Sequence, residues 1–217
     1  MIQRPANVNW SDSWTHMGIK FSMDDPDQAM GLVPVDQMAY TLSNQPRWSG
    51  RLAHFYSVAQ HSILVSQEID QRWALQGLLH DIHEAFIGDV TVCMRAAIAR
   101  AFGLQADWMD SYEQTWIDAT WRRFELEPPP PDELKRADKA VLKKEMQLIQ
   151  PYLVGEPQYE WLPDCQSKEL KHLDIAPLRW FGTGFAFRDF LDRFCELSFK
   201  LGRREEIGEA KILTNCQ

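Results

Sequence analysis

Hydrophobic residues recur three and four positions apart along most of the chain, which is the spacing that places them on one face of a helix. The pattern predicts an all-α fold. Expected helices cover residues 34–43, 57–69, 71–87, 91–102, 106–124, 133–150 and 184–201. Turn-forming residues dominate the first 35 positions, so this segment is expected to form loops and allows a short hairpin.

Residues at the ends of these patterns are those that cap helices. Ser57 is expected to be the N-cap of one helix, and Gly88 suits the C-cap of the next. Four consecutive prolines at 128–131 end a helix, and Asp132 is expected to cap the one that follows. Capping residues and prolines therefore predict where these helices begin and end.

A single domain is predicted for residues 1–217, with a core of about 35–150 and an irregular C-terminal extension of about 151–217 that ends in the last helix. Neither an internal repeat nor a Gly/Ser-rich linker divides the chain. At this length a globule hides roughly 70% of its unfolded surface, so the core needs no covalent crosslinks.

The charge balance narrows the class of partner. The chain has 31 Asp and Glu against 23 Lys and Arg, a formal charge of −8, and its basic runs are only two residues long. Proteins that grip nucleic-acid polymers usually carry a basic stripe, so no such partner is expected. A small anionic ligand remains compatible, because a metal ion and a few arginines can offset its charge locally.

Cysteine spacing and hydropathy exclude further classes. The four cysteines lie too far apart for a C-x-x-C pair, which excludes a zinc finger and a thioredoxin-like motif. The N-terminus lacks an apolar signal region, and no stretch approaches the ~18 apolar residues of a membrane span. We therefore expect a cytoplasmic protein with no membrane partner.

One helical segment combines an apolar face with a chemically active one. At about 100° per residue, Leu78 and Ile82 fall in the apolar arc, whereas His80, Asp81 and Glu84 fall together on the opposite arc. An adjacent His–Asp pair offers one metal ion both an imidazole nitrogen and a carboxylate oxygen, and Glu84 lies one turn further on. The alternative interpretation is a solvated helix face.

Two other helices contribute residues of the same type. His61 lies at the edge of an apolar stripe, where the alternative is a core histidine bonded to a backbone carbonyl. Asp138 lies near the middle of an apolar face that also carries Glu145, and a buried carboxylate needs either a cation or an arginine partner. With His80 and Asp81 they form a four-ligand N/O set that leaves coordination positions for water and substrate.

The order H…HD…D among helices resembles the HD-domain phosphohydrolase superfamily. The resemblance covers residues 35–150 and is closest to the bacterial 5′-deoxynucleotidases and the phage dATP triphosphohydrolases. Its motifs are Arg47-Trp48, Tyr56-Ser-Val-Ala-Gln-His61-Ser, Leu-Leu-His80-Asp81-x-x-Glu84-Ala-x-x-Gly-Asp89 and Ala137-Asp138-x-x-x-Leu142-x-x-Glu145. It implies an HD-type helical bundle, one catalytic divalent metal ion (Co, Mn, Zn, Fe, Ni or Mg) and nucleotide substrates.

The resemblance also implies roles for individual residues. The metal ligands would be His61, His80, Asp81 and Asp138. Glu84 would orient or deprotonate the attacking water, and Asp89 would contact the sugar. Arg47 would lie near phosphate and sugar, and Trp48 would crowd the ribose 2′ side and so favour deoxyribose. For this last pair, a loop arginine beside a core-filling tryptophan is the alternative.

Two positions depart from the family pattern. Gln60 stands where relatives commonly have Glu, and His83 stands where many have a small residue. His83 is expected either to touch phosphate at the pocket edge or to pack behind the ligands.

The expected function is a metal-dependent phosphohydrolase that removes phosphate from deoxynucleotides, with mono- and triphosphates both open as substrates. The alternatives are another HD chemistry, such as cyclic-nucleotide phosphodiesterase activity, and a catalytically silent nucleotide-binding protein. A homo-oligomer also remains open.

Overall fold

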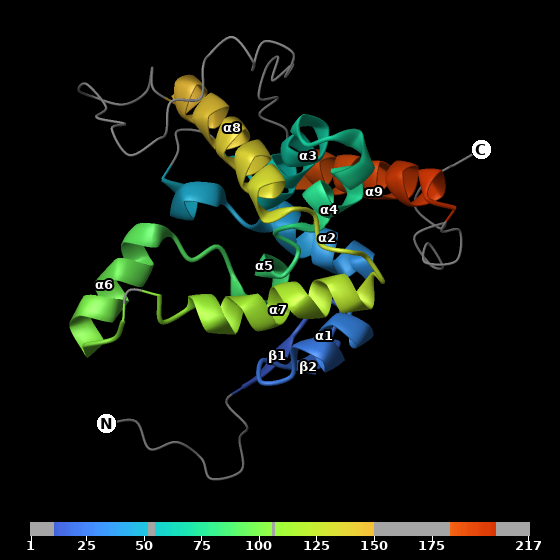
Figure 1. Cartoon of the computed structure of the whole chain (residues 1–217). Coiled ribbons are helices and arrows are strands. Elements are labelled where there is room, and N and C mark those ends of the chain that lie inside the picture. Colours follow the sequence, from blue (N-terminus) through green and yellow to red (C-terminus); the bar gives the residue numbers. More distant parts are fainter. Residues whose placement is uncertain (1–10, 52–54, 106, 150–182, 203–217) are drawn as a thin grey trace.

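The computed structural model describes residues 11–51, 55–105, 107–149 and 183–202. This part of the chain is mostly helical, as predicted (Figure 1). Its helices are α1 Pro26–Leu32, α2 Val35–Asn44, α3 Val58–Glu68, α4 Ala74–Leu79, α5 Glu84–Ile87, α6 Val92–Phe102, α7 Asp110–Arg123, α8 Pro131–Ile149 and α9 Thr183–Lys200. Two short 3₁₀ turns, η1 Arg47–Gly50 and η2 Gln71–Trp73, precede α3 and α4. The irregular segment expected over residues 151–176 lies outside the described residues.

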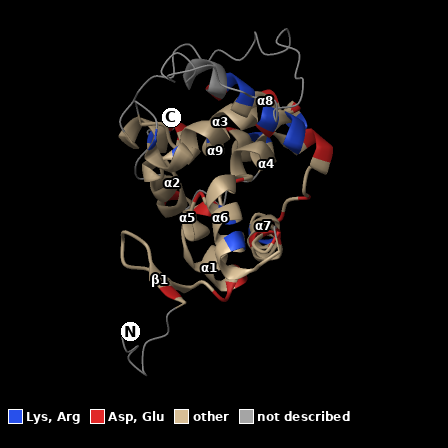
Figure 2. Ribbon diagram, turned by 90° about the vertical axis from the view of Figure 1, so that its left-hand side faces the viewer, with Lys and Arg blue, Asp and Glu red and all other residues tan. Residues whose placement is uncertain are grey.

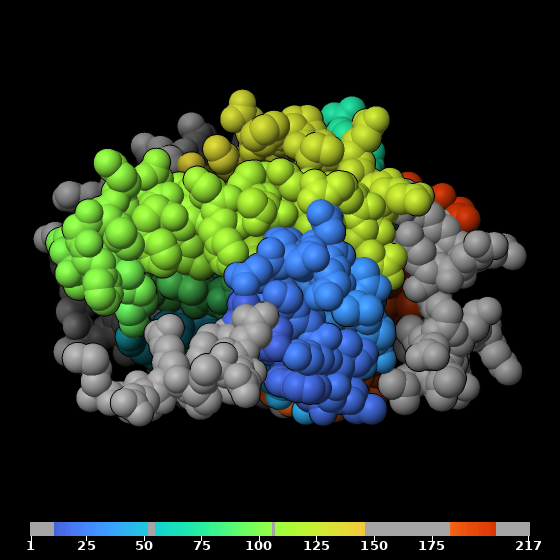
Figure 3. Space-filling view, turned by 90° about the horizontal axis from the view of Figure 1, so that it is seen from below, coloured from blue at the N-terminus to red at the C-terminus, as the bar shows by residue number. Residues whose placement is uncertain are grey.

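A small hairpin is the one sheet in the described part of the chain. Strand β1 (Asp12–Trp14) pairs antiparallel with β2 (Lys20–Ser22), and Ser13 lies opposite Phe21. The hairpin and α1 lie against the band that α6 and α7 form across the molecule (Figure 3). The hairpin that the N-terminal sequence allowed is therefore present.

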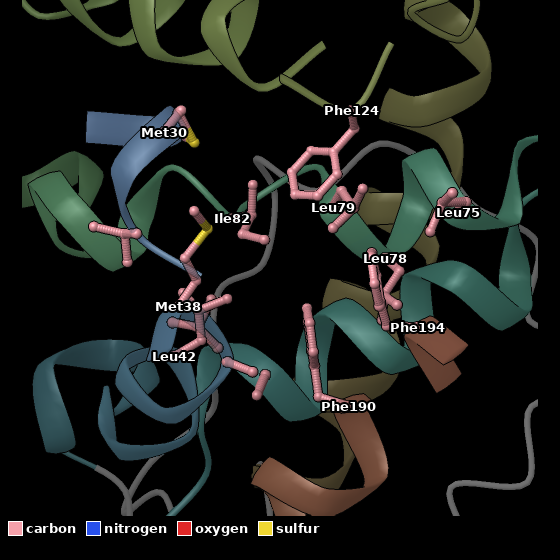
Figure 4. Packing of buried hydrophobic residues seen from close by; sticks show 14 of the residues in the cluster. Met30, Met38, Leu42, Leu75, Leu78, Leu79, Ile82, Phe124, Phe190 and Phe194 are labelled. Carbon is pink, nitrogen blue, oxygen red and sulfur yellow. The ribbon is translucent and has the colours of Figure 1, made fainter. Parts of the chain in front are cut away.

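The main core lies where the apolar faces of several helices meet, α3 and α7 among them. Met30 of α1, Met38 and Leu42 of α2, and Phe190 and Phe194 of α9 surround the apolar side of α4 (Figure 4). The predicted apolar arc supplies that side of the core, and its fully buried or nearly buried members are Leu75, Leu78, Leu79 and Ile82. Because this arc faces the core, the opposite arc of the same segment faces α3 and α8.

The expected cap of α3 is confirmed and extends to a full capping box. The Ser57 hydroxyl accepts from the Gln60 backbone N–H at 3.3 Å, and the Gln60 side chain accepts from the Ser57 backbone N–H at 3.0 Å. Glu and Gln both serve at this position of a capping box, so the departure at Gln60 keeps the start of α3 intact. Gly88, with φ of 82°, ends α5 as expected.

Three features of the chain differ from the predicted elements. Asp132, expected to cap α8, lies within its first turn, because the helix begins at Pro131. Helix α1 lies in a segment expected to form loops, and it begins where Asp25 accepts from the Gln28 backbone N–H and Pro26 fills the first turn. The single helix expected over 71–87 is interrupted at residues 80–83.

The interruption has a local cause. The imidazole Nδ1 of His80 lies 2.8 Å from the carbonyl oxygen of Gly77, and that of His83 lies 3.1 Å from the carbonyl oxygen of His80. These side chains compete for carbonyls that a regular helix would use, and the backbone tightens into i→i+3 bonds such as Ile82 N–H to Leu79.

Helix α4 lies unusually close to α3 at Gly77. A Cβ on Gly77 would come within 2.8 Å of the Ile69 side chain and 3.2 Å of the Ser66 Cα atom. The absence of a side chain thus lets the His80–Asp81 segment approach α3, which carries His61. In the described part of the chain, no helix has the length and apolarity needed to cross a membrane.

Replacing this glycine tests the close approach. Gly77→Ala is expected to lower the free energy of unfolding by about 1–3 kcal/mol, because the added methyl meets backbone as well as side-chain atoms. Gly31→Ala in α1 is the control, since its Cβ would meet nothing within 4 Å. Urea denaturation of both variants measures the difference, and equal stabilities would show that the α3–α4 contact tolerates a side chain.

Candidate metal centre

Two elements bring three of the four predicted metal ligands together. His61 comes from α3, whereas His80 and Asp81 come from the turn between α4 and α5. Asp81 Oδ2 lies 3.1 Å from His80 Nε2 and 3.7 Å from His61 Nε2. One ligand atom from each residue lies within 4.8 Å of the other two, an arrangement that could hold a metal ion.

Asp138 of α8, the fourth predicted ligand, borders this group. Its Oδ1 lies 3.1 Å from His61 Nε2, but it does not join the set of atoms that all lie within 4.8 Å of one another. Its side chain is 41% exposed, whereas that of His61 is fully buried. Burial would raise the pKa of Asp138, but the nearby imidazole of His61 outweighs it and holds this pKa below its usual value. Asp138 therefore closes the group on its more exposed edge.

Both imidazoles are oriented by a partner on the ring nitrogen that faces away from the group. His61 Nδ1 lies 2.7 Å from Glu145 Oε1, and His80 Nδ1 lies 2.8 Å from the Gly77 carbonyl oxygen. A carboxylate or carbonyl acceptor on Nδ1 leaves the Nε2 lone pair free for a cation. The partner of His61 is thus a carboxylate, not the backbone carbonyl of the alternative interpretation.

Unpartnered polar atoms support the fit to a cation. The Nε2 atoms of His61 and His80 are buried and lack a hydrogen bond of normal geometry, although each lies 3.1 Å from a carboxylate oxygen. Burial and Arg47 lower the pKa of His61, but Glu145 and Asp138 outweigh both and raise it to about 9. The carboxylates thus favour positive charge at His61.

Arg47 lies inside the molecule beside this group. Its guanidinium is 3.5 Å from Glu145 and 3.9 Å from Asp81, and its side chain is only 14% exposed. Burial alone would lower the pKa of Arg47, but these two carboxylates raise it above its ordinary value. Arg47 is therefore held as a largely buried cation beside the candidate metal ligands.

Trp48 has an unusual backbone conformation. Its φ of 59° and the φ of 53° at Ser49 place two successive non-glycine residues in the left-handed region. Such residues cost roughly 1–3 kcal/mol each and collect at functional sites. The indole is half-buried, and its Nε1 is buried without a hydrogen bond. Trp48 is not part of the two buried hydrophobic clusters of the described chain, so it does not fill the core.

Glu84 is a buried carboxyl group at the first position of α5. Its Oε2 atom has no hydrogen-bond partner among the described residues. Burial raises the pKa of Glu84 well above its usual value, and the nearby charges of Asp81 and Asp89 add to this effect. A carboxylate with a raised pKa and an open oxygen is a stronger proton acceptor than an ordinary carboxylate.

The Gln45 amide connects the end of α2 to the segment that carries Glu84 and Asp89. In the orientation that satisfies both groups, it donates to the Glu84 carbonyl at 3.0 Å and accepts from the Asp89 backbone N–H. Burial raises the pKa of the half-buried Asp89. Gln45 therefore fixes the backbone of two predicted site residues, a role that sequence reasoning did not assign.

His83 packs behind the ligand group. Its ring is 3% exposed, and its Nε2 lies 3.5 Å from Glu113 of α7. Glu113 itself makes two contacts with Arg95 of α6, at 2.5 and 2.6 Å. Burial would raise the pKa of Glu113, but His83 and Arg95 lower it to about 2. This position favours the packed role over the phosphate contact.

Sequence reasoning also gave no role to Glu145 and Tyr56. Glu145 is fully buried on α8, and its Oε1 accepts from the Tyr56 hydroxyl at 2.6 Å as well as facing His61. The signal was present in the sequence as a carboxylate on the apolar face of α8, seven residues after Asp138. In Figure 2, acidic residues lie beside α5 near the middle of the molecule, whereas basic residues gather along α8.

The chain is similar in sequence to proteins whose names state no activity. The chain is 31% identical to the uncharacterized protein YfdR of Escherichia coli K12 over 174 residues, which cover 76% of this chain and 85% of YfdR. It is also 31% identical to an uncharacterized protein of Rhodobacter capsulatus over 138 residues, which cover 59% of this chain and 67% of that protein. No protein-family model matches the chain.

Removal of one ligand tests the metal centre. His80→Ala is expected to abolish bound divalent metal, because it removes an imidazole nitrogen and leaves Asp81 without its 3.1 Å neighbour. His16→Ala is the control, since His16 lies on the hairpin and stacks on Tyr40. Elemental analysis after dialysis against Mn²⁺ or Co²⁺ measures both variants, and full occupancy in His80→Ala would remove His80 from the ligand set.

Proposed function

The chain belongs to the family of the uncharacterized protein YfdR, and we propose that it is an HD-domain, divalent-metal-dependent phosphohydrolase that removes phosphate from deoxynucleotides. One observation carries the proposal. Two imidazoles present buried Nε2 atoms beside Asp81 that make no hydrogen bond of normal geometry with any described residue, and the buried carboxyl group of Glu84 follows on the same segment. A metal site next to a proton acceptor is an arrangement that can catalyse hydrolysis of phosphate esters.

The ion would be held by His61, His80 and Asp81, with Asp138 at the border of the group. A mixed set of imidazole and carboxylate donors suits Mn²⁺, Fe²⁺, Co²⁺, Ni²⁺ or Zn²⁺, while Mg²⁺ prefers oxygen donors. When bound, the ion supplies Lewis acidity toward a phosphoryl oxygen and toward water.

Glu84 is the proposed proton acceptor. Glu84 follows Asp81 by three residues. Its Oε2 atom accepts no hydrogen bond from any described residue. Burial raises the pKa of Glu84 well above its usual value, which makes it a stronger proton acceptor than an ordinary carboxylate.

Arg47 and Trp48 are the proposed substrate contacts. The Arg47 guanidinium remains charged inside the molecule and lies 3.9 Å from Asp81, so it can face a phosphoryl oxygen beside the ligand group. Trp48 follows it in a strained backbone conformation, which supports the proposal that its indole forms a wall of the pocket on the 2′ side of the sugar. Asp89, held through Gln45, would contact the sugar hydroxyl.

Phosphate release from a nucleotide panel tests the proposal. The wild-type protein is incubated with deoxy- and ribonucleoside mono- and triphosphates and with cyclic nucleotides, each with Mn²⁺, Co²⁺ or Mg²⁺. Metal-dependent release from deoxynucleotides is expected. Hydrolysis of cyclic nucleotides alone would indicate a phosphodiesterase, and tight nucleotide binding without turnover by the metal-loaded protein would indicate a silent binding protein.

The role of Glu84 is tested by an isosteric change. Glu84→Gln is expected to retain metal and to lower kcat by about 10²–10⁴-fold, because the amide accepts no proton. Since the base must be deprotonated, wild-type kcat/KM should fall as pH drops below the raised pKa of Glu84, and this acid limb should vanish in the variant.

The matched control is Glu68→Gln, because Glu68 and Glu84 are each 8% exposed. Glu68 pairs with Arg136 away from the ligand group, and its substitution should leave kcat unchanged. A Glu84→Gln variant as active as this control would remove Glu84 from the mechanism.

The sugar-wall role of Trp48 is tested by kinetics on a matched deoxy/ribo pair. An extra 2′ hydroxyl left unpaired against the indole costs roughly 1–3 kcal/mol, so the wild type should favour the deoxynucleotide at least about tenfold in kcat/KM. Trp48→Ala should narrow this ratio by admitting the ribonucleotide. Trp73→Ala, which removes another half-buried indole with an unpartnered Nε1, should leave the ratio unchanged. The same ratio in all three proteins would contradict the assignment.

A further inference from the structure

Glu145 is the most deeply buried carboxylate of the site, and its two oxygens face different functional residues. Its exposed fraction is 0%, and Oε1 lies 2.7 Å from His61 Nδ1 and 2.6 Å from the Tyr56 hydroxyl. Its Oε2 lies 3.5 Å from the guanidinium of Arg47. One side chain of α8 thus contacts a candidate metal ligand, a candidate substrate contact and the residue that precedes the cap of α3.

A buried carboxylate is a costly way to stabilise a fold. Burying a charge is costly unless donors surround it, and well-packed apolar side chains of similar volume often serve a core equally well. Beside Glu145 lies a hydrophobic cluster of Tyr56, Val65, Ile69, Ala137, Ala140 and Val141. A carboxylate at the edge of this cluster therefore points to a role in the site.

The contact with His61 selects one form of the imidazole. A carboxylate oxygen only accepts hydrogen bonds, so Nδ1 must carry a proton. The lone pair is then on Nε2, the atom that faces Asp138 at 3.1 Å and Asp81 at 3.7 Å. An acceptor of this kind fixes the ring and makes the metal-facing nitrogen more basic.

The second oxygen of Glu145, Oε2, contacts Arg47 at the start of η1. The Arg47 backbone N–H donates to the Tyr56 carbonyl at 2.9 Å, so the Arg47 and Tyr56 backbones are joined beside the carboxylate. The Tyr56 hydroxyl and the Arg47 guanidinium then meet the two oxygens of Glu145. The side chains of His61, Tyr56 and Arg47 therefore all contact the carboxylate of Glu145.

We propose that Glu145 is a positioning residue, which holds His61 with Nε2 toward the metal position and, through its other oxygen, holds Arg47 beside it. The inference rests on the proposed function and extends it. It assigns to Glu145, which touches neither metal nor substrate, the role of connecting the metal ligand His61 to the substrate contact Arg47.

The isosteric variant Glu145→Gln disturbs both contacts. With its amide nitrogen toward His61, the side chain requires the imidazole form with Nε2 protonated, which binds no metal. With its oxygen toward His61, the amide N–H groups face the Arg47 guanidinium, donor against donor. In either orientation the negative charge that makes His61 more basic is lost.

The experiment measures metal affinity and the protonation form of His61, not turnover alone. Equilibrium dialysis with Mn²⁺ is expected to show affinity about 10–100-fold weaker in Glu145→Gln than in the wild type. In ¹⁵N-histidine NMR spectra of the Zn²⁺-loaded wild type, His61 should carry its proton on Nδ1. The KM for the nucleotide should also rise, because Arg47 is released.

Two variants separate positioning from packing. Glu68→Gln changes a buried carboxylate that also bridges α3 and α8, through its 2.9 Å contact with Arg136, and it should leave the Mn²⁺ affinity unchanged. Tyr56→Phe removes a donor to Glu145 but keeps the His61 contact, and it should lower the melting temperature with a smaller loss of affinity than Glu145→Gln.

A folded Glu145→Gln variant with wild-type Mn²⁺ affinity would overturn the proposal, as would equal losses of affinity in Glu145→Gln and Tyr56→Phe. Failure of the proposed function is recognised separately. In that case the wild-type protein itself would bind no metal or release no phosphate, whatever the variants do.

Discussion

Burial of charge is the constraint around which the centre of this molecule is arranged. Carboxylates of Asp81, Glu84 and Glu145 lie in a helical interior with little water to solvate them. Burial opposes ionisation of each one, and nearby positive charge together with hydrogen-bond donors offsets that cost. Arg47 and His61 supply part of it: the pKa of His61 is raised to about 9, and Arg47 is held charged. A divalent cation among His61, His80 and Asp81 would offset the remainder more fully than a proton does.

One close helix contact and one tightened turn bring these charged residues together. Gly77 lets α4 approach α3, so that His80 and Asp81 lie near His61 on the neighbouring helix. The turn at 80–83 then places Glu84 at the start of a new helix, where its carboxyl group follows the ligands. Because the apolar arc of the same segment is packed into the core by α2 and α9, the polar arc has a fixed position.

Much of this could be predicted from the sequence where the determining chemistry is local. The cap at Ser57 depends on residues within one turn, and the two arcs of the segment around His80 follow from helical geometry. The signal for α1 was also local, an Asp followed by Pro at 25–26, but the many turn-forming residues around it favoured a loop. The interruption of the helix at 80–83 depends on imidazoles that take backbone carbonyls, which hydrophobic periodicity does not report.

Tertiary contacts account for what the sequence did not reveal. Glu145 contacts His61 and Tyr56, which precede it by 84 and 89 residues, and no periodic pattern joins positions so far apart. The half-buried position of Asp138, 3.1 Å from His61, likewise depends on how α8 lies across α3. The position of His83 was left open between two roles, and only the neighbouring Glu113 of α7 favours the packed one.

Anomalous diffraction from crystals of the wild-type protein grown with Mn²⁺ or Co²⁺ tests most directly whether the buried charges surround a cation. The account predicts an anomalous peak in contact with the Nε2 atoms of His61 and His80 and with an oxygen of Asp81. A crystal that holds the metal elsewhere, with His61 still paired to Asp138 and no peak between the two imidazoles, would contradict it.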